Sequence, residues 1–193
     1  MKNTFSSKLI LALLAAGLMA GCVTKPPPPP PPPPPTPVKK VVPPYTWNET
    51  DAKGPKRIVV DVSAQRVYFY RGETRVGDSR CSTGKKGFAT ACGQFQVTQK
   101  DRNHKSNLYG TFVNGSGTVV KRDVDMSKMP VPEGCSFNGA KMPFYLRFTG
   151  GYGLHAGHVP NYPASHGCVR LPHGMAARLF ENVEVGTPVI VHQ

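Results

Sequence analysis

An unbroken run of ten prolines at residues 26–35 constrains the fold of this chain more than any other segment. Proline has a fixed φ and no backbone N–H, so the run can enter neither a helix interior nor a sheet and forms an extended polyproline II helix. At about 3.1 Å per residue it spans roughly 31 Å as a semi-rigid spacer; a docking peptide for an SH3-like partner is the alternative. Because residues up to Pro55 stay polar and rich in proline, we expect the folded domain to begin near Lys56.

The first 21 residues have the pattern of a secretory signal peptide. Lys2 and Lys8 precede an apolar run at residues 9–20, which is shorter than the roughly 20 residues needed to span a bilayer. Residues 19–22, Met-Ala-Gly-Cys, resemble the bacterial lipoprotein box, in which the cysteine becomes the acylated first residue. We therefore predict a lipoprotein signal peptide over 1–21 and a lipidated Cys22 that begins a Pro-rich spacer over 22–55. An ordinary signal peptide that contains Cys22 is the alternative.

The segment 56–193 has the pattern of a mainly β domain. Short runs rich in Val, Tyr and Phe, separated by turn residues, predict strands at 57–62, 65–71, 74–81, 93–100, 108–113, 117–120, 144–148 and 187–191. Apolar residues fall at helical spacing only over 175–183, with Pro172 suited to the first turn and Gly186 to the end. These elements predict a sandwich or barrel-like domain with one short C-terminal helix.

A histidine and a cysteine within residues 153–171, GLHAGHVPNYPASHGCVRL, carry the chemistry that we expect of the domain. A thiol attacks a carbonyl as thiolate and needs a base or a positive partner beside it. His155 precedes Cys168 by thirteen positions, and glycines and prolines between them favour a loop that folds back on itself. The segment therefore predicts a strand, a folded loop and a second strand that begins at Cys168.

This motif resembles the signature of the L,D-transpeptidase catalytic (YkuD-like) domain family, which remodels bacterial peptidoglycan. The signature is a His, a variable loop, then Ser/Thr-His-Gly-Cys, an apolar residue and Asn or Arg, and this chain has His155 and the run 165–170, Ser-His-Gly-Cys-Val-Arg. Upstream runs at 57–62, 65–70, 82–84, 93–97 and 106–110 are similar to the family as well, so the resemblance covers roughly 56–193. Two departures stand out: a shorter loop before Ser165, and Thr90-Ala91-Cys92-Gly93 where members usually carry Thr-Pro-Thr-Gly.

The resemblance implies a transpeptidase with Cys168 as nucleophile and His155 as a general base that also holds the thiolate as an ion pair. In the family the cysteine attacks the carbonyl of the third stem-peptide residue, expels D-alanine and forms a thioester. An amine acceptor then takes the acyl group, giving a 3→3 cross-link or attachment to a protein. The resemblance implies no cofactor and no metal, and it implies covalent inhibition by carbapenems.

Supporting roles also follow from the resemblance. Backbone N–H groups around His166, Gly167 and Cys168 are the candidates to bind the oxyanion. By the same resemblance Ser165 and Arg170 shape the pocket, and Arg170 could bind a stem carboxylate as a bidentate pair.

Several alternatives compete with this interpretation. Cys168 could be a buried structural thiol, or it could form a zinc site with His155, His158, His166 and His173, although their spacing matches no standard zinc pattern. A papain-like hydrolase would place its cysteine before its histidine, the reverse of this order. Within the resembling family, water could be the acceptor, giving an L,D-carboxypeptidase or amidase. A wall-binding lipoprotein without turnover is a further alternative.

The charge balance and the N-terminal pattern predict where the protein acts. With 24 Lys and Arg against 11 Asp and Glu, the chain favours an anionic surface, here stem peptides with free carboxylates or lipid headgroups. The basic residues form no continuous stripe with interleaved aromatics, so nucleic acid is not an expected partner. We expect an exported, membrane-anchored lipoprotein that faces the periplasm or cell wall. Val23 after Cys22 indicates the outer membrane if the envelope is Gram-negative.

Three cysteines remain besides Cys22 and Cys168. Cys81, Cys92 and Cys135 can form at most one disulfide, with three possible pairings, or can all stay reduced.

Overall fold

The structure is a computed structural model that describes residues 43–48, 51–160 and 162–193. The chain divides into two units, Met1–Lys40 and Val41–Gln193, and the described residues belong to the second. The predicted signal peptide, Cys22 and the proline run lie outside the described residues.

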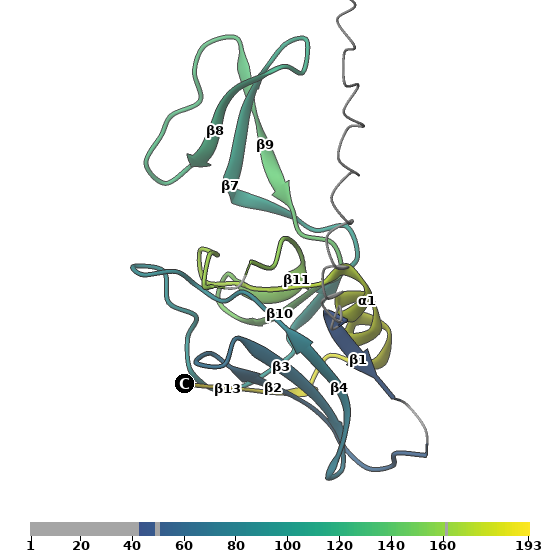
Figure 1. Cartoon of the computed structure of the whole chain (residues 1–193). Helices are drawn as coiled ribbons and strands as arrows, with labels where there is room; N and C mark the ends of the chain where they lie inside the picture. Colours follow the sequence, from purple (N-terminus) through teal and green to yellow (C-terminus); the bar gives the residue numbers. More distant parts are fainter. Residues whose placement is uncertain (1–42, 49–50, 161) are drawn as a thin grey trace, which may run out of the picture. The chain divides into compact units, whose positions relative to one another are not determined.

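Strands dominate the described part of the chain, as the sequence predicts, and they form three sheets (Figure 1). The order is β1-β4-β3-β2-β13-β5 in the six-stranded sheet, β12-β11-β10-β6 in the four-stranded sheet and β8-β7-β9 in the three-stranded sheet. The elements are β1 (Tyr45–Trp47), β2 (Lys56–Asp61), β3 (Arg66–Arg71), β4 (Thr74–Arg80), β5 (Gly93–Gln96), β6 (Gln99–Asp101), β7 (Lys105–Asn114), β8 (Val119–Asp125), β9 (Cys135–Lys141), β10 (Tyr145–Thr149), β11 (Tyr152–Ala156), β12 (Val169–Leu171), α1 (His173–Asn182) and β13 (Pro188–His192).

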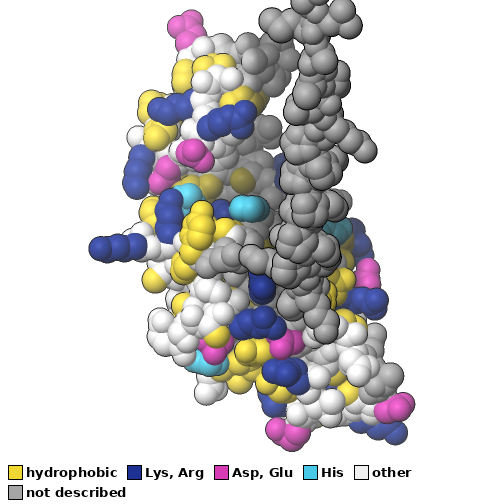
Figure 2. Space-filling model, viewed as in Figure 1, with side chains coloured by type: hydrophobic (Ala, Val, Ile, Leu, Met, Phe, Trp, Pro, Cys, Tyr) yellow, Lys and Arg dark blue, Asp and Glu magenta, His cyan; other side chains and the backbone are white. Residues whose placement is uncertain are grey.

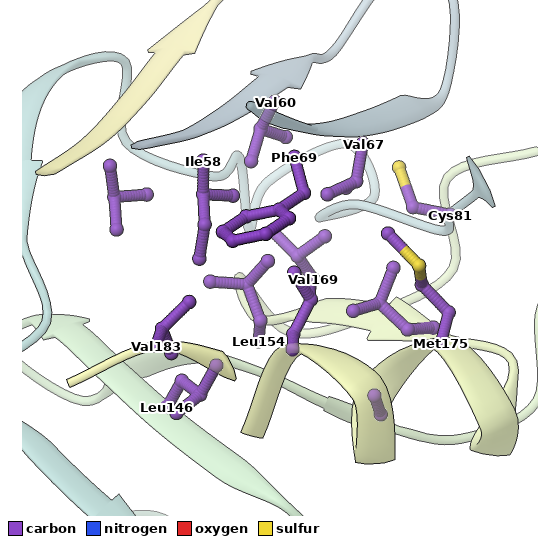
Figure 3. Close-up of a cluster of buried hydrophobic side chains, with 14 of the residues drawn as sticks. Ile58, Val60, Val67, Phe69, Cys81, Leu146, Leu154, Val169, Met175 and Val183 are labelled. Carbon is purple, nitrogen blue, oxygen red and sulfur yellow. The ribbon is translucent and has the colours of Figure 1, made fainter. Parts of the chain in front are cut away.

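The core lies between the six-stranded sheet, the four-stranded sheet and α1. Alternate residues of β2 and β3, such as Ile58 and Phe69, are fully buried because successive side chains of a strand point to opposite faces. They meet Leu154 and Val169 from the four-stranded sheet and Met175 from α1 (Figure 3). Each such side chain contributes about 1.5–3 kcal/mol when it is fully buried. The sheet that carries His155 is therefore anchored by its inner face.

Strand β1 corrects the expected start of the packed domain. The sequence predicts a polar, proline-rich spacer up to Pro55 with little that could pack, yet Tyr45–Trp47 pairs antiparallel with β4. The Trp47 ring also stacks on the core residue Phe69, with centroids 5.1 Å apart and planes 7° apart. Tyr45 and Trp47 pack against the core and β1 is an edge strand of the six-stranded sheet, so packed structure begins upstream of Lys56.

The C-terminal helix forms where the spacing predicts it. Met175, Ala176 and Leu179 of α1 are buried, and Pro172 is the N-cap residue. The helix ends earlier than expected, since Val183 is already extended, and Gly186 with φ +95° belongs to the turn before β13. Among the described residues no helix has the length and apolar character needed to cross a membrane.

Candidate active site

His155 and Cys168 are brought together by parallel pairing of β11 and β12. Leu154 pairs with Val169 and His155 with Arg170. Because side chains alternate along a strand, Leu154 and Val169 enter the core, and Cys168, just before β12, lies on the same face as Arg170 and His155. His155, Cys168 and Arg170 all line one pocket. Strands form at both predicted apolar runs, 144–148 and 169–171, as β10 and β12. Between them the structure has a strand that was not predicted, β11, which contains His155 and pairs parallel with β12.

The loop between the two strands is held by the segment that follows β4. The backbone N–H groups of Ala164 and Ser165 both donate to Thr83 O at 3.0 Å, and Lys85 N donates to Ser165 O at 3.0 Å. Ser82 N and O exchange hydrogen bonds with Arg170 at 3.0 and 2.9 Å. The shorter loop therefore folds back onto a fixed backbone template, which sets the position of Cys168.

His155 is oriented and held neutral by its surroundings. Its Nδ1 lies 2.9 Å from Ala156 O. A carbonyl can only accept, so Nδ1 carries the proton and Nε2 keeps its lone pair. Burial lowers the pKa of His155 to about 4, assisted by the charges of Arg170 and His104 and opposed by the Ala156 carbonyl. The imidazole is therefore a neutral base at pH 7.

Cys168 is half-buried, and its surroundings favour the protonated thiol over the thiolate. Its Sγ lies 3.7 Å from Gly151 O, which can accept the weak S–H donor. Burial raises the pKa of the Cys168 thiol, while the Gly153 N–H and the guanidinium groups of Arg170 and Arg147 act in the opposite direction. These directions favour a neutral thiol and a neutral imidazole in the same pocket, whereas the sequence led us to expect an ion pair.

The residues before Cys168 build a rigid turn. The buried Ser165 hydroxyl donates to Cys168 O and accepts the Gly167 N–H at 3.0 Å. Gly167 has φ +113°, and a Cβ there would lie 2.3 Å from the Tyr152 ring, so only glycine fits. Since Ser165 already binds the Gly167 N–H, the N–H groups of His166 and Cys168 remain as the expected oxyanion donors.

His166 links the turn to the three-stranded sheet. Its ring stacks on Tyr109 of β7, with centroids 4.3 Å apart and planes 16° apart, and meets Phe88 edge-on at 4.6 Å. Burial lowers the pKa of His166, and the charge of Lys85 acts in the same direction. These contacts fit a residue that orients the loop. Tyr109 lies in the run 106–110 that resembles the family, but its contact with His166 could not be predicted, and nothing in the sequence indicated Phe88.

A second group that the sequence did not indicate supports the floor of the site. Tyr145 Oη donates to Gly151 O at 2.9 Å, the same carbonyl that faces the Cys168 thiol. The Tyr145 ring stacks on His104, with centroids 4.2 Å apart, and His104 Nδ1 lies 3.0 Å from Asp101 Oδ2. This series of contacts fixes the turn between β10 and β11 that carries the thiol's hydrogen-bond partner.

The pocket lies between the three-stranded sheet and the four-stranded sheet and has a volume of about 900 Å³. Lys105, Lys141, Arg147 and Arg170 line it, and no Asp or Glu does so within the described part of the chain. On the face shown in Figure 2, Lys and Arg are scattered among other side chains and do not form a stripe. The basic residues that line the pocket around the thiol therefore favour binding of an anionic ligand.

The zinc alternative finds no support in the geometry. Among the described residues, no three His, Cys, Asp or Glu side chains come together as a metal site. His158 is exposed at the pocket, whereas His173 opens α1 and meets the Phe144 ring edge-on at 5.1 Å. His158 and His173 therefore lie in different surroundings and do not form a shared site.

The remaining described cysteines are unpaired. Cys81 is buried in the core (Figure 3), Cys92 is exposed and Cys135 begins β9, and all three are free. The sequence allowed either one disulfide among these three cysteines or none, and in the structure all three are reduced.

The fold and the site together define an enzyme domain of the L,D-transpeptidase class. The family model for the L,D-transpeptidase catalytic domain, YkuD, matches residues 55–191. This chain therefore belongs to the L,D-transpeptidase catalytic domain family.

Solved structures share the fold at low sequence identity. An L,D-transpeptidase from Stackebrandtia nassauensis has a TM-score of 0.52 and 23% identity, covering 74% of this chain and 57% of its own. One from Mycobacterium smegmatis has a TM-score of 0.55 and 22% identity, covering 72% and 59%. An L,D-transpeptidase in complex with imipenem, LdtMt1, has a TM-score of 0.53 and 21% identity, covering 71% and 58%. The match thus spans less than three-fifths of each of these proteins. Among curated protein sequences, none matches this chain significantly.

Proposed function

We propose that this protein is a peptidoglycan L,D-transpeptidase that works through a thioester on Cys168. The observation that carries the proposal is the pairing of β11 with β12, which presents the neutral His155 and the Cys168 thiol to one cationic pocket. Membership of the family supports the reaction class. The imipenem complex of a protein with the same fold supports binding of carbapenems by this chain, and through Cys168 we expect this inhibition to be covalent.

Acylation begins at the neutral thiol. As Cys168 Sγ bonds to the carbonyl carbon of the third stem residue, its proton passes to Nε2 of His155, whose Nδ1–H is fixed by Ala156 O. The carbonyl oxygen becomes an oxyanion near the Cys168 N–H. The bond to the terminal D-alanine then breaks, and its nitrogen takes the proton from His155. The product is a thioester and free D-alanine.

Deacylation reverses the proton flow. His155 accepts a proton from the attacking amine of another stem or of a protein, a C–N bond forms, and the Cys168 thiol is released and reprotonated. Arg170 and Arg147, which flank the thiol, are the candidates to bind the stem carboxylates. The protein would act as an exported lipoprotein, anchored through Cys22 and facing the cell wall.

The test is release of D-alanine from tetrapeptide-bearing muropeptides by the purified domain. We expect release and cross-linked dimers from the wild-type protein and neither from Cys168→Ala. Tripeptide monomers without dimers would instead assign water as acceptor and make the enzyme a carboxypeptidase. Undiminished release by Cys168→Ala would exclude the thioester mechanism.

A further inference from the structure

The hydroxyl of Thr90 joins two backbone segments directly behind the nucleophile. Thr90 Oγ1 donates to Gly167 O at 2.8 Å and accepts the Gly84 N–H at 2.9 Å. The side chain is only 3% exposed, and Thr90 is not among the residues that line the pocket. Any influence of Thr90 on a bound substrate must therefore pass through the backbone that it holds.

The carbonyl that Thr90 binds belongs to the peptide between Gly167 and Cys168. In a planar trans peptide the C=O and N–H groups point in opposite directions. A carbonyl fixed toward Thr90 therefore turns the Cys168 N–H away from Thr90. The Gly167 N–H already donates to Ser165 Oγ. The direction of the Cys168 N–H is thus set by a hydroxyl that no part of the proposed mechanism uses.

The turn that presents Thr90 is closely packed. A Cβ at Gly84 would lie 1.9 Å from Phe88 O, so the chain between these residues closes tightly and brings the hydroxyl to the Gly84 N–H. Gly167 has no Cβ to restrict its backbone, and its peptide orientation therefore depends on hydrogen bonds. Thr90 and Ser165 supply them from two sides.

We propose that Thr90 is a positioning residue that aims the Cys168 N–H at the oxyanion. The proposal rests on the proposed function, in which attack by Cys168 Sγ forms an S–C bond and moves the carbonyl π electrons onto oxygen. A backbone donor held in advance stabilises that charge without reorganisation during the step. Without the hydroxyl, the peptide can rotate and the donor loses its alignment.

Two reactions of the Cys168 thiol can distinguish a misaligned Cys168 N–H from a less reactive sulfur. Acylation by imipenem passes through an oxyanion, in which the lactam C–N bond breaks after attack and its nitrogen takes the proton from His155. Alkylation by iodoacetamide displaces iodide at a saturated carbon and forms no oxyanion. Both rates can be followed at Cys168 by intact mass and peptide mapping, with iodoacetamide also labelling the exposed Cys92.

We expect Thr90→Val to slow acylation roughly 10- to 100-fold. Alkylation of Cys168 should stay within about twofold of the wild-type rate, because it needs no oxyanion donor. Thr90→Ser keeps the hydroxyl and should acylate at nearly the wild-type rate. Thr187→Val is the matched control, since Thr187 is also buried and its hydroxyl accepts the Glu184 N–H at 3.0 Å, ahead of β13 and outside the pocket lining.

Acylation of Thr90→Val at the wild-type rate would overturn the proposal. So would equal slowing of acylation and alkylation, which indicates a structural role, or the same loss of acylation in Thr187→Val. If Thr90→Val does not fold, Thr90→Ala against Thr187→Ala gives the same comparison. Failure of the wild-type protein to be acylated would instead count against the proposed function itself.

Discussion

Burial sets the protonation state of His155 and Cys168, and it favours the neutral form of each. It lowers the pKa of the imidazole and raises the pKa of the thiol. With a neutral thiol and a neutral imidazole, the site holds no buried charge on either group before the reaction. Proton transfer from the thiol to the imidazole can then accompany attack on the carbonyl. The sequence named both residues as candidates, but their burial depends on how the strands pack, which a linear motif does not contain.

The depressed pKa of His155 predicts how stability depends on pH. The folded-state value of about 4 lies below the ordinary value of 6.5, so the unfolded chain binds the proton more readily. The contribution of His155 is fully present above pH 6.5 and is lost as the pH falls through 6.5 toward 4, by an amount on the order of 3 kcal/mol. Denaturant unfolding at pH 7 and 4.5 should show a larger loss for wild type than for His155→Gln. An equal loss in both proteins would contradict the assignment.

Substitution of Gly167 should affect both stability and the acylation of Cys168. Gly167 and Gly87 both have positive φ, +113° and +83°, but a Cβ would strike the Tyr152 ring only at Gly167 and would meet nothing within 4 Å at Gly87. Alanine at either position should cost backbone strain of about 1–2 kcal/mol. Only Gly167→Ala should also displace the turn before Cys168, with an acylation rate at least about 10-fold lower. Similar acylation rates for the two variants would show that the Tyr152 contact does not position the turn.

Among the elements, those with strong apolar patterns could be predicted and those held by distant partners could not. The strand pattern of β2 and β3 and the helical spacing of α1 are intrinsic to their segments. Strand β9, with the sequence CSFNGAK, has almost no apolar alternation and forms because β7 provides its hydrogen-bond partners. The parallel pairing of β11 with β12 was also missed, since loop composition predicts a reversal but not the direction of pairing.

The edge strand β1 makes a testable contribution to stability. Trp47 stacks on Phe69, whereas its neighbour Thr46 is exposed. We expect Trp47→Ala to lower the free energy of unfolding by about 2–3 kcal/mol, below the range for a fully buried Trp because Trp47 is only half-buried. Thr46→Ala on the same strand should change it by less than about 0.5 kcal/mol. Equal small effects of the two substitutions in denaturant unfolding would mean that β1 is not part of the stable domain. The family match begins at residue 55 and does not include β1.

At the scale of the whole molecule, the four-stranded sheet contributes both to the core and to the candidate site. Two sheets and α1 form the core, and the third, β8-β7-β9, supplies Tyr109, Lys105 and Lys141 to the pocket above the thiol. The net charge of +13 indicated an anionic partner, but only the fold shows which cations surround Cys168. The motif of residues 153–171 therefore predicted the family, whereas the cations and aromatic contacts around Cys168 depend on tertiary structure.

The measurement that tests the central claim most directly is the intact mass of the domain after incubation with imipenem. A single adduct on wild type, mapped to Cys168, with none on Cys168→Ala and a much slower one on His155→Gln, is the predicted result. No adduct on folded wild-type protein, or an adduct that persists in Cys168→Ala, would contradict a nucleophilic Cys168 served by His155.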